Sequence, residues 1–119
     1  MKHLTCPVAL HPDGAPLRLA LETGQMLPPF TEFLNDPAPA AARHLFSTLG
    51  LETRSAVPIG VSKETVEACT THFVLCRIAP PTRRQWKHLQ PDGTMITAHW
   101  VAFEDLPSSP RMDWIKANL

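Results

Sequence analysis

Residues 36–51, DPAPAAARHLFSTLGL, decide the fold that we expect for this chain. Asp36 followed by Pro37 is typical of a helix start. The aspartate side chain accepts hydrogen bonds from the first free backbone N–H groups, and proline at the first helical position needs no partner for an N–H. Gly50 is typical of a helix end because glycine adopts the left-handed conformation at little cost. The segment therefore predicts a helix from Pro37 to about Leu49.

One side of this predicted helix is apolar. Ala42, Leu45, Phe46 and Leu49 recur at spacings of three and four residues, which places them along one stripe. We expect that stripe to pack against a β-sheet. The opposite side is polar but carries no carboxylates, and the question is what such a helix does.

Strand patterns lie on both sides of the helix. Before it, residues 6–10 and 17–22 are apolar runs around the turn signal Asp13-Gly14, which predicts a β-hairpin. In the second run every other residue is leucine, the pattern of a strand with one buried face. Residues 23–35 are predicted as a loop. After the helix we expect strands over residues 55–61, 68–79 and 95–103, a surface connection over 80–94, a turn over 104–110 and a short helix over 111–119.

This order of elements indicates an α+β fold with a mixed β-sheet between helices, in the manner of an α/β/α sandwich. A chain of 119 residues is long enough to bury a core, and we expect a single domain over residues 1–119. Eleven basic and eleven acidic side chains cancel, so no strong field indicates nucleic acid or an anionic membrane. Three cysteines, with neither a signal peptide nor a membrane-spanning run, favour reduced thiols in the cytoplasm.

The helix end and its flanks resemble a family signature. The segment resembles the Nudix box, a motif of hydrolases of nucleoside diphosphate derivatives. Its arginine position holds Arg43, its first aliphatic position Leu45, its glycine position Gly50 and its last aliphatic position Leu51. The stretch around Trp86-x-His88, the strand that follows and the terminal helix are similar to the second half of many Nudix domains. The resemblance therefore covers nearly the whole chain, and it implies a Nudix-like fold of one domain.

The chain departs from the box at every position that carries chemistry. Where the family has glycine and four glutamates, this sequence has Pro29, Asn35, His44, Ser47 and Thr48. In the family those glutamates hold Mg²⁺ or Mn²⁺ against a diphosphate, which requires charged oxygen ligands. Their loss implies a catalytically impaired or inactive protein that binds a nucleotide-like ligand or another small metabolite. No confident catalytic residue, metal ligand or cofactor follows from the sequence.

The residues that we expect to contact such a ligand come from the box helix and from the Trp-x-His segment. Trp86 could stack on a flat group, and the basic side chains beside it could meet phosphate. The expected ligand-binding residues are Arg43, Ser47, Thr48, Trp86 and His88, with Arg83, Arg84 and Lys87 nearby. Packing of Trp86 over the sheet under a solvated basic loop is the simpler interpretation.

Two alternatives stay open. In the first, a divergent Nudix pyrophosphohydrolase uses replacement acids with Mg²⁺ or Mn²⁺. The candidate acids are Glu32 and Asp36, with Glu22, Glu52 and Glu67 further away. In the second, the chain is a non-catalytic protein-interaction module, for which a homodimer is one arrangement.

Two further patterns are weaker. Cys69, His72 and Cys76 have a spacing that suggests zinc, but in a strand Cys69 would face away from the other two. Ser47 lacks the Gly-x-Ser-x-Gly turn of a serine hydrolase. Neither pattern changes the expectation of a Nudix-like domain without its original chemistry.

Overall fold

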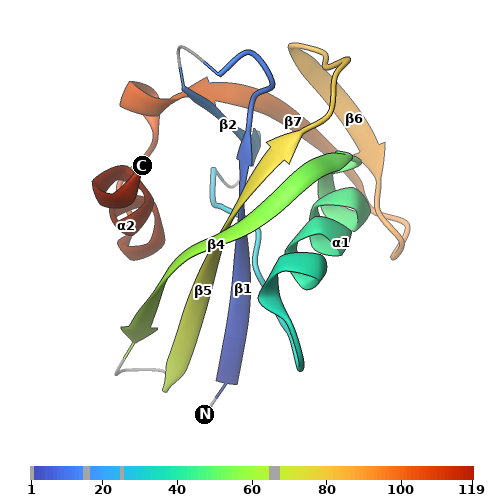
Figure 1. The fold of residues 1–119 in the computed structure, drawn as a ribbon. Helices are drawn as coiled ribbons and strands as arrows, with labels where there is room; N and C mark the ends of the chain where they lie inside the picture. Colours follow the sequence, from blue (N-terminus) through green and yellow to red (C-terminus); the bar gives the residue numbers. More distant parts are fainter. Residues whose placement is uncertain (1, 15–16, 25, 65–67) are drawn as a thin grey trace.

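The computed structural model describes residues 2–14, 17–24, 26–64 and 68–119. Its strands form one mixed sheet with a helix on each face (Figure 1). The strands are β1 (Lys2–Leu10), β2 (Arg18–Glu22), β3 (Thr31–Glu32), β4 (Thr53–Glu64), β5 (Cys69–Ile78), β6 (Gln85–Leu89) and β7 (Met95–Ala102). The helices are α1 (Pro37–Leu49), the 3₁₀ turn η1 (Phe103–Asp105) and α2 (Pro110–Asn118). The predicted α+β fold with a mixed sheet between helices is confirmed.

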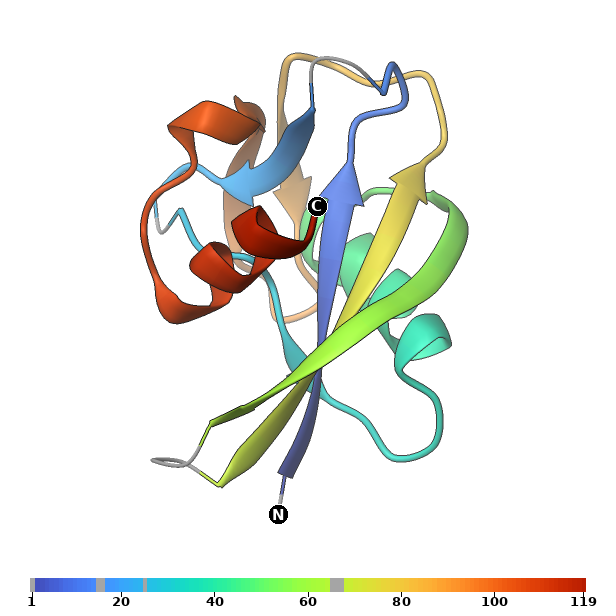
Figure 2. The same ribbon diagram turned by 60° about the vertical axis from the view of Figure 1, so that its left-hand side comes forward.

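The strand order is β4-β5-β1-β2-β7-β6, and β3 also pairs with β1. β1 lies parallel to β5 and antiparallel to its other neighbours. The long crossover from β1 to β5 contains α1, as a parallel pair requires. Because β5 occupies one edge of β1, β2 and β3 share the other edge, β3 near Leu4 and β2 at Leu10. Figure 2 shows α2 on one side of the strongly twisted strands and α1 on the other.

Helix α1 begins and ends where the sequence predicts. The Asp36 carboxylate accepts a hydrogen bond from the Ala38 N–H at 3.1 Å. Gly50 is left-handed with φ of 70°, and its N–H donates to the Phe46 carbonyl. The buried stripe is formed by Ala41, Leu45 and Leu49, which pack against β-strand residues of one core cluster.

The expectation for Phe46 was wrong, because its side chain is 62% exposed. Ala41, Leu45 and Leu49 are four residues apart and form a narrow line. Phe46 follows Leu45 by one residue and so points about 100° away from that line. An apolar side chain thus lies on the solvent side of the helix.

Helix α2 covers the other face of the sheet. Ser109 caps it by accepting from the Met112 N–H at 3.1 Å. Met112 and Ile115 are fully buried, whereas Leu119, at the end of the helix, is 37% exposed. Trp114 stacks on Phe73 with ring centroids 3.9 Å apart. None of the helices among the described residues offers an apolar stretch of the length that crossing a membrane requires.

Three further expectations need correction. The connection predicted over residues 80–94 contains β6, which pairs antiparallel with β7 from Gln85 opposite His99 to Leu89 opposite Met95. The loop predicted over 23–35 contains the two-residue β3. β2 is buried on both faces, because Ala20, expected on the polar side, packs into the core beneath α1.

Candidate functional site

The C-terminal turn of α1 is held by side chains from β6 and from Gln90, the residue that follows it. The last carbonyls of a helix lack partners within the helix. Alternate residues of a strand face the same side, so positions 86, 88 and 90 all reach these carbonyls. The bonds join Trp86 Nε1 to Leu49 O (2.7 Å), His88 Nε2 to Ser47 O (3.0 Å) and Gln90 Nε2 to Thr48 O (3.4 Å). We call these three side chains the β6 clamp.

The β6 clamp explains why Gly50 follows the helix. The His88 ring packs against the Gly50 backbone, and a Cβ added there would lie 2.6 Å from His88 Nδ1. Gly50 is therefore needed for its positive φ and for this close approach. A carbonyl oxygen only accepts, so His88 must donate from Nε2 to Ser47.

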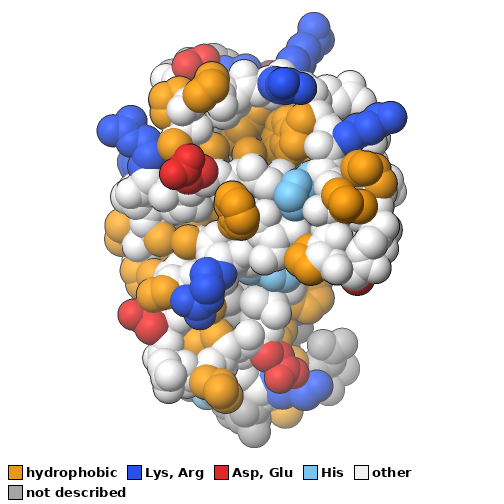
Figure 3. Space-filling view, turned by 90° about the vertical axis from the view of Figure 1, so that its right-hand side faces the viewer, with side chains coloured by type: hydrophobic (Ala, Val, Ile, Leu, Met, Phe, Trp, Pro, Cys, Tyr) orange, Lys and Arg blue, Asp and Glu red, His pale blue; other side chains and the backbone are white. Residues whose placement is uncertain are grey.

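One hollow lies beside the β6 clamp, and we call it the β6 cavity. Its volume is about 250 Å³, and it is lined by Gly50, Thr82, Arg83, Trp86, Lys87 and His88, among others. No acid is among its described lining residues. On the face that carries α1 and β6, Figure 3 shows a hollow with hydrophobic atoms on its floor, a histidine beside it and basic side chains around it. This cavity combines an aromatic wall with positive charge.

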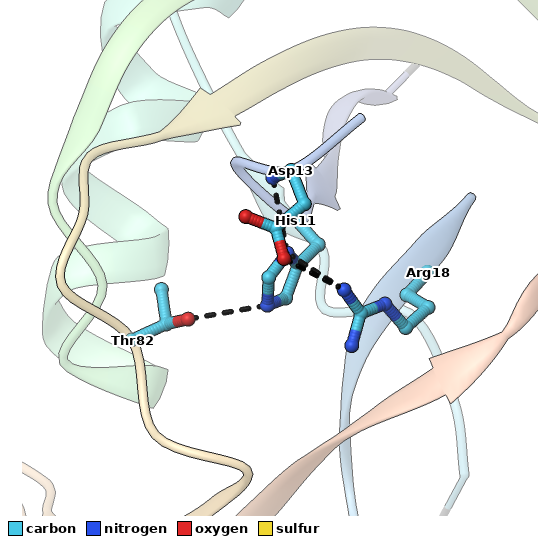
Figure 4. Close-up of polar contacts among 4 residues, drawn as sticks. All are labelled: His11, Asp13, Arg18 and Thr82. Carbon is cyan, nitrogen blue, oxygen red and sulfur yellow. Dashed lines mark hydrogen bonds and ion pairs between the residues drawn. The ribbon is translucent and has the colours of Figure 1, made fainter. Parts of the chain in front are cut away.

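The loop before the β6 cavity is fixed by a polar cluster at the end of the predicted hairpin (Figure 4). His11 Nδ1 accepts from the Asp13 N–H at 3.1 Å, and Arg18 bridges to the Asp13 carboxylate at 3.2 Å. With Nδ1 accepting, His11 Nε2 donates to Thr82 Oγ1, 3.2 Å away. Burial, assisted by the Arg18 guanidinium, lowers the pKa of His11, and Asp13 opposes this shift. The His-Pro-Asp-Gly turn thus anchors the segment that precedes β6.

A second hollow lies between residues 27–30 and the side of α1 that carries His44 and Thr48, and we call it the box cavity. Its volume is about 200 Å³. Leu27, Pro28, Pro29 and Phe30 form an apolar wall. The polar lining consists of Glu22, His44, Thr48 and Gln90.

The backbone and the ring of Phe30 both hold the loop that forms the apolar wall. The backbone of Phe30 bonds to the His44 side chain. The Arg111 guanidinium from α2 lies over the Phe30 ring, 4.1 Å from its centroid. Burial lowers the pKa of His44, and the hydrogen bond to the Phe30 backbone opposes this shift only in part. The box cavity is therefore preformed.

The five predicted ligand-binding residues do not line a single cavity. Trp86 and His88 line the β6 cavity, and Thr48 lines the box cavity. Ser47 takes part through its backbone carbonyl, which accepts from His88. Arg43 is exposed and lines a separate hollow near the start of α1. The two cavities at the end of α1 share Leu49, and the box cavity is also lined by His44 and Thr48.

The two main candidate acids, Glu32 and Asp36, line one hollow near the start of α1, which is separate from the box cavity that Glu22 lines. Glu32 pairs with Lys2 at 3.5 Å on the surface, and Asp36 caps α1. Glu52 is exposed, and Glu67 lies outside the described residues. Among the described residues, no group of three or more His, Cys, Asp or Glu side chains is arranged to hold a metal ion. Of the described acids, only Glu22 lines the box cavity.

The residues of the zinc pattern do not converge. Cys69 and Cys76 are buried and take part in no disulfide bond. His72 instead faces His3, with His3 Nδ1 and His72 Nε2 3.1 Å apart. Sequence reasoning did not identify Gln90 or Phe30 as site residues, and no local signal marks them, because each joins the site only through the fold.

Comparisons with known proteins support the fold. No family model matches the sequence, and no curated protein matches it. A solved structure from a study of MutT from the fish pathogen Aliivibrio salmonicida and from Vibrio cholerae is similar over 99% of this chain and 98% of that chain. Its TM-score is 0.70 and its sequence identity is 12%. The chain therefore has the α+β fold of the Nudix hydrolase MutT.

Proposed function

We propose that this chain is a Nudix-fold binding domain without metal-dependent hydrolase activity, whose box cavity takes a planar, nitrogen-containing group such as a nucleobase. The observation that carries the proposal is the lining of the box cavity. It includes the Glu22 carboxylate and neither lysine nor arginine among the described residues. A carboxylate repels phosphate and accepts hydrogen bonds from N–H groups.

The residues of the box cavity do not fit the metal that the fold family uses. Mg²⁺ prefers several oxygen ligands, including carboxylates, in a near-octahedral arrangement. Glu22 is one carboxylate, and His44 is a ligand for softer metals. The Thr48 hydroxyl donates to the His44 carbonyl at 2.6 Å. The donor set therefore supports binding of an organic group and not of a magnesium diphosphate.

The same residues can recognise the edge of a heterocycle. Glu22 offers two oxygen acceptors to neighbouring N–H groups. The Gln90 amide nitrogen donates to the Thr48 carbonyl. The side-chain oxygen of Gln90 is left as a further acceptor. Leu27, Pro28 and Phe30 supply apolar surface for the flat faces of a ring. Ribose and phosphates would extend out of the cavity.

Calorimetric titration with nucleobases, nucleosides and nucleoside diphosphates, each with and without Mg²⁺, tests this proposal. We expect binding of the base-containing ligands that does not depend on Mg²⁺. Glu22→Gln should weaken it about tenfold or more, because a charge-assisted hydrogen bond is lost. Glu104→Gln, at an exposed position on η1, is the matched control and should bind like wild type.

Two results would contradict the proposal. One is binding of diphosphates that requires Mg²⁺, as the divergent hydrolase predicts. The other is unchanged affinity in Glu22→Gln, which would place the ligand elsewhere on the protein.

A further inference from the structure

The His3 and His72 imidazoles form a cluster at the end of the sheet away from the β6 clamp. His3 lies on β1 and His72 on the parallel neighbour β5, where His72 pairs with Thr5. Residues 3 and 5 of one strand share a face, so both histidines lie on the α1 side of the sheet. His3 Nδ1 and His72 Nε2 are 3.1 Å apart.

Phe33 restricts both rings. Its ring meets His72 edge-on, with centroids 5.0 Å apart and planes at 89°. It meets His3 at 6.2 Å and 71°. The Phe33 N–H also donates to the His3 carbonyl at 3.2 Å, which ties the loop before α1 to β1. The two nitrogens are thus held in position by the fold.

We propose that His3 and His72 form a two-histidine site for a divalent transition-metal ion of the zinc class. The nitrogen separation fits a single ion. With Zn–N bonds of about 2.0–2.1 Å, nitrogens 3.1 Å apart subtend about 98° at the metal, between octahedral and tetrahedral angles. Imidazole is a preferred ligand of such metals.

The rest of the coordination sphere would be water. Among the described residues no third His, Cys, Asp or Glu completes a metal-binding group here. The three cysteines are buried and do not offer an accessible competing site. The site joins β1, β5 and the Phe33 loop, so the ion would stabilise the native state through linkage.

Titration of the untagged protein with Zn²⁺ by calorimetry tests this assignment, with histidine NMR signals as a second measurement. We expect one Zn²⁺ per chain and shifts of the His3 and His72 ring signals. His3→Gln and His72→Gln should each weaken binding by at least about tenfold, since loss of a ligand costs no less than loss of an outer-shell partner.

His99→Gln is the matched control. The His99 ring bonds to Thr23, and His99 lies on β7, which does not neighbour β1 or β5. It should bind Zn²⁺ like wild type. Circular dichroism of each variant establishes that it folds. Absence of binding to wild type at millimolar Zn²⁺ would overturn the assignment, as the pair would then be an N–H···N hydrogen bond only. Equal binding by wild type and His72→Gln, or equal loss in His99→Gln, would also overturn it.

Discussion

The C-terminal turn of α1 faces two different surroundings. Toward β6, its carbonyls receive hydrogen bonds from Trp86, His88 and Gln90. Toward the box cavity it faces Glu22, whose carboxylate makes no hydrogen bond or ion pair with the described residues. Each side chain of the β6 clamp donates a hydrogen bond to α1, whereas the Glu22 carboxylate in the box cavity retains free hydrogen-bonding capacity.

This difference separates structural from ligand-binding roles along one helix. Polar groups that satisfy each other contribute to stability and have little left for a ligand. A partly buried carboxylate without a partner is available to bind one. Substitutions in the β6 clamp should therefore change the free energy of unfolding, and substitutions in the box cavity should change ligand binding.

The largest expected effect is that of Gly50→Ala. Alanine would have to adopt φ of 70°, at a cost of about 1–2 kcal/mol. Its Cβ would also displace the His88 ring and leave the Ser47 carbonyl without this partner, a further cost of about 1–3 kcal/mol. Urea denaturation should show a loss of about 2–5 kcal/mol in the free energy of unfolding.

Gly93→Ala is the control for that substitution. Gly93 has φ of 88°, and a Cβ added there meets nothing within 4 Å. It should show the backbone cost alone, and an equal loss in the two variants would refute the role of the His88 contact.

Trp86→Phe should have the next largest effect. It removes the donor to Leu49 O and leaves that carbonyl unpaired, which costs about 1–3 kcal/mol. Trp100→Phe is the matched variant, because the buried Trp100 Nε1 has no hydrogen-bond partner among the described residues. Thermal denaturation should therefore give a clearly smaller loss for Trp100→Phe, and the reverse order would contradict the β6 clamp.

Glu22→Gln is expected to show the opposite behaviour. Its free energy of unfolding should stay within about 0.5 kcal/mol of wild type, as for substitutions away from structural contacts. Its affinity for a base-containing ligand should fall about tenfold, which corresponds to about 1.4 kcal/mol. Trp86→Phe should retain affinity at temperatures where it is folded. Loss of stability without loss of binding in Glu22→Gln would remove the distinction between the two regions.

The smallest effect is a pH dependence through His44. Its folded pKa lies below 6.5, so below pH 6.5 the unfolded chain binds more protons than the native chain. Stability from this group is constant above pH 6.5 and falls as the pH drops toward the folded pKa. The slope is at most about 1.4 kcal/mol per pH unit for one group. Denaturation between about pH 7.5 and 5.5 should show that the free energy of unfolding falls less steeply in His44→Gln than in wild type. Some decline should remain, because the pKa values of His11 and His72 are also lowered.

Local signals were sufficient to predict α1. Its aspartate-proline start and glycine end act within a few residues, so they can be identified without tertiary structure. β6 was not predicted, because its inward-facing side chains, Trp86 and His88, are polar or amphipathic. Their burial depends on the carbonyls at the end of α1, which no local pattern reveals.

The candidate site was predictable only in part. Trp86 and His88 were selected for ligand contact because of their place in a family pattern, but their polar atoms are bonded to α1. Glu22 was one of several candidate acids. The fold brings Glu22 on β2 together with the loop of residues 27–30 and Gln90 around one cavity, and no local pattern predicts this.

The most direct test of the central claim is an assay of hydrolysis of nucleoside diphosphate derivatives by the purified protein with Mg²⁺ or Mn²⁺. We predict turnover below about 0.1 s⁻¹, roughly a hundredfold below a median enzyme, because no group of three or more His, Cys, Asp or Glu side chains among the described residues is arranged to hold a metal ion. Faster, metal-dependent turnover that disappears in Glu22→Gln or Glu32→Gln would contradict the account. It would instead identify the chain as a divergent pyrophosphohydrolase.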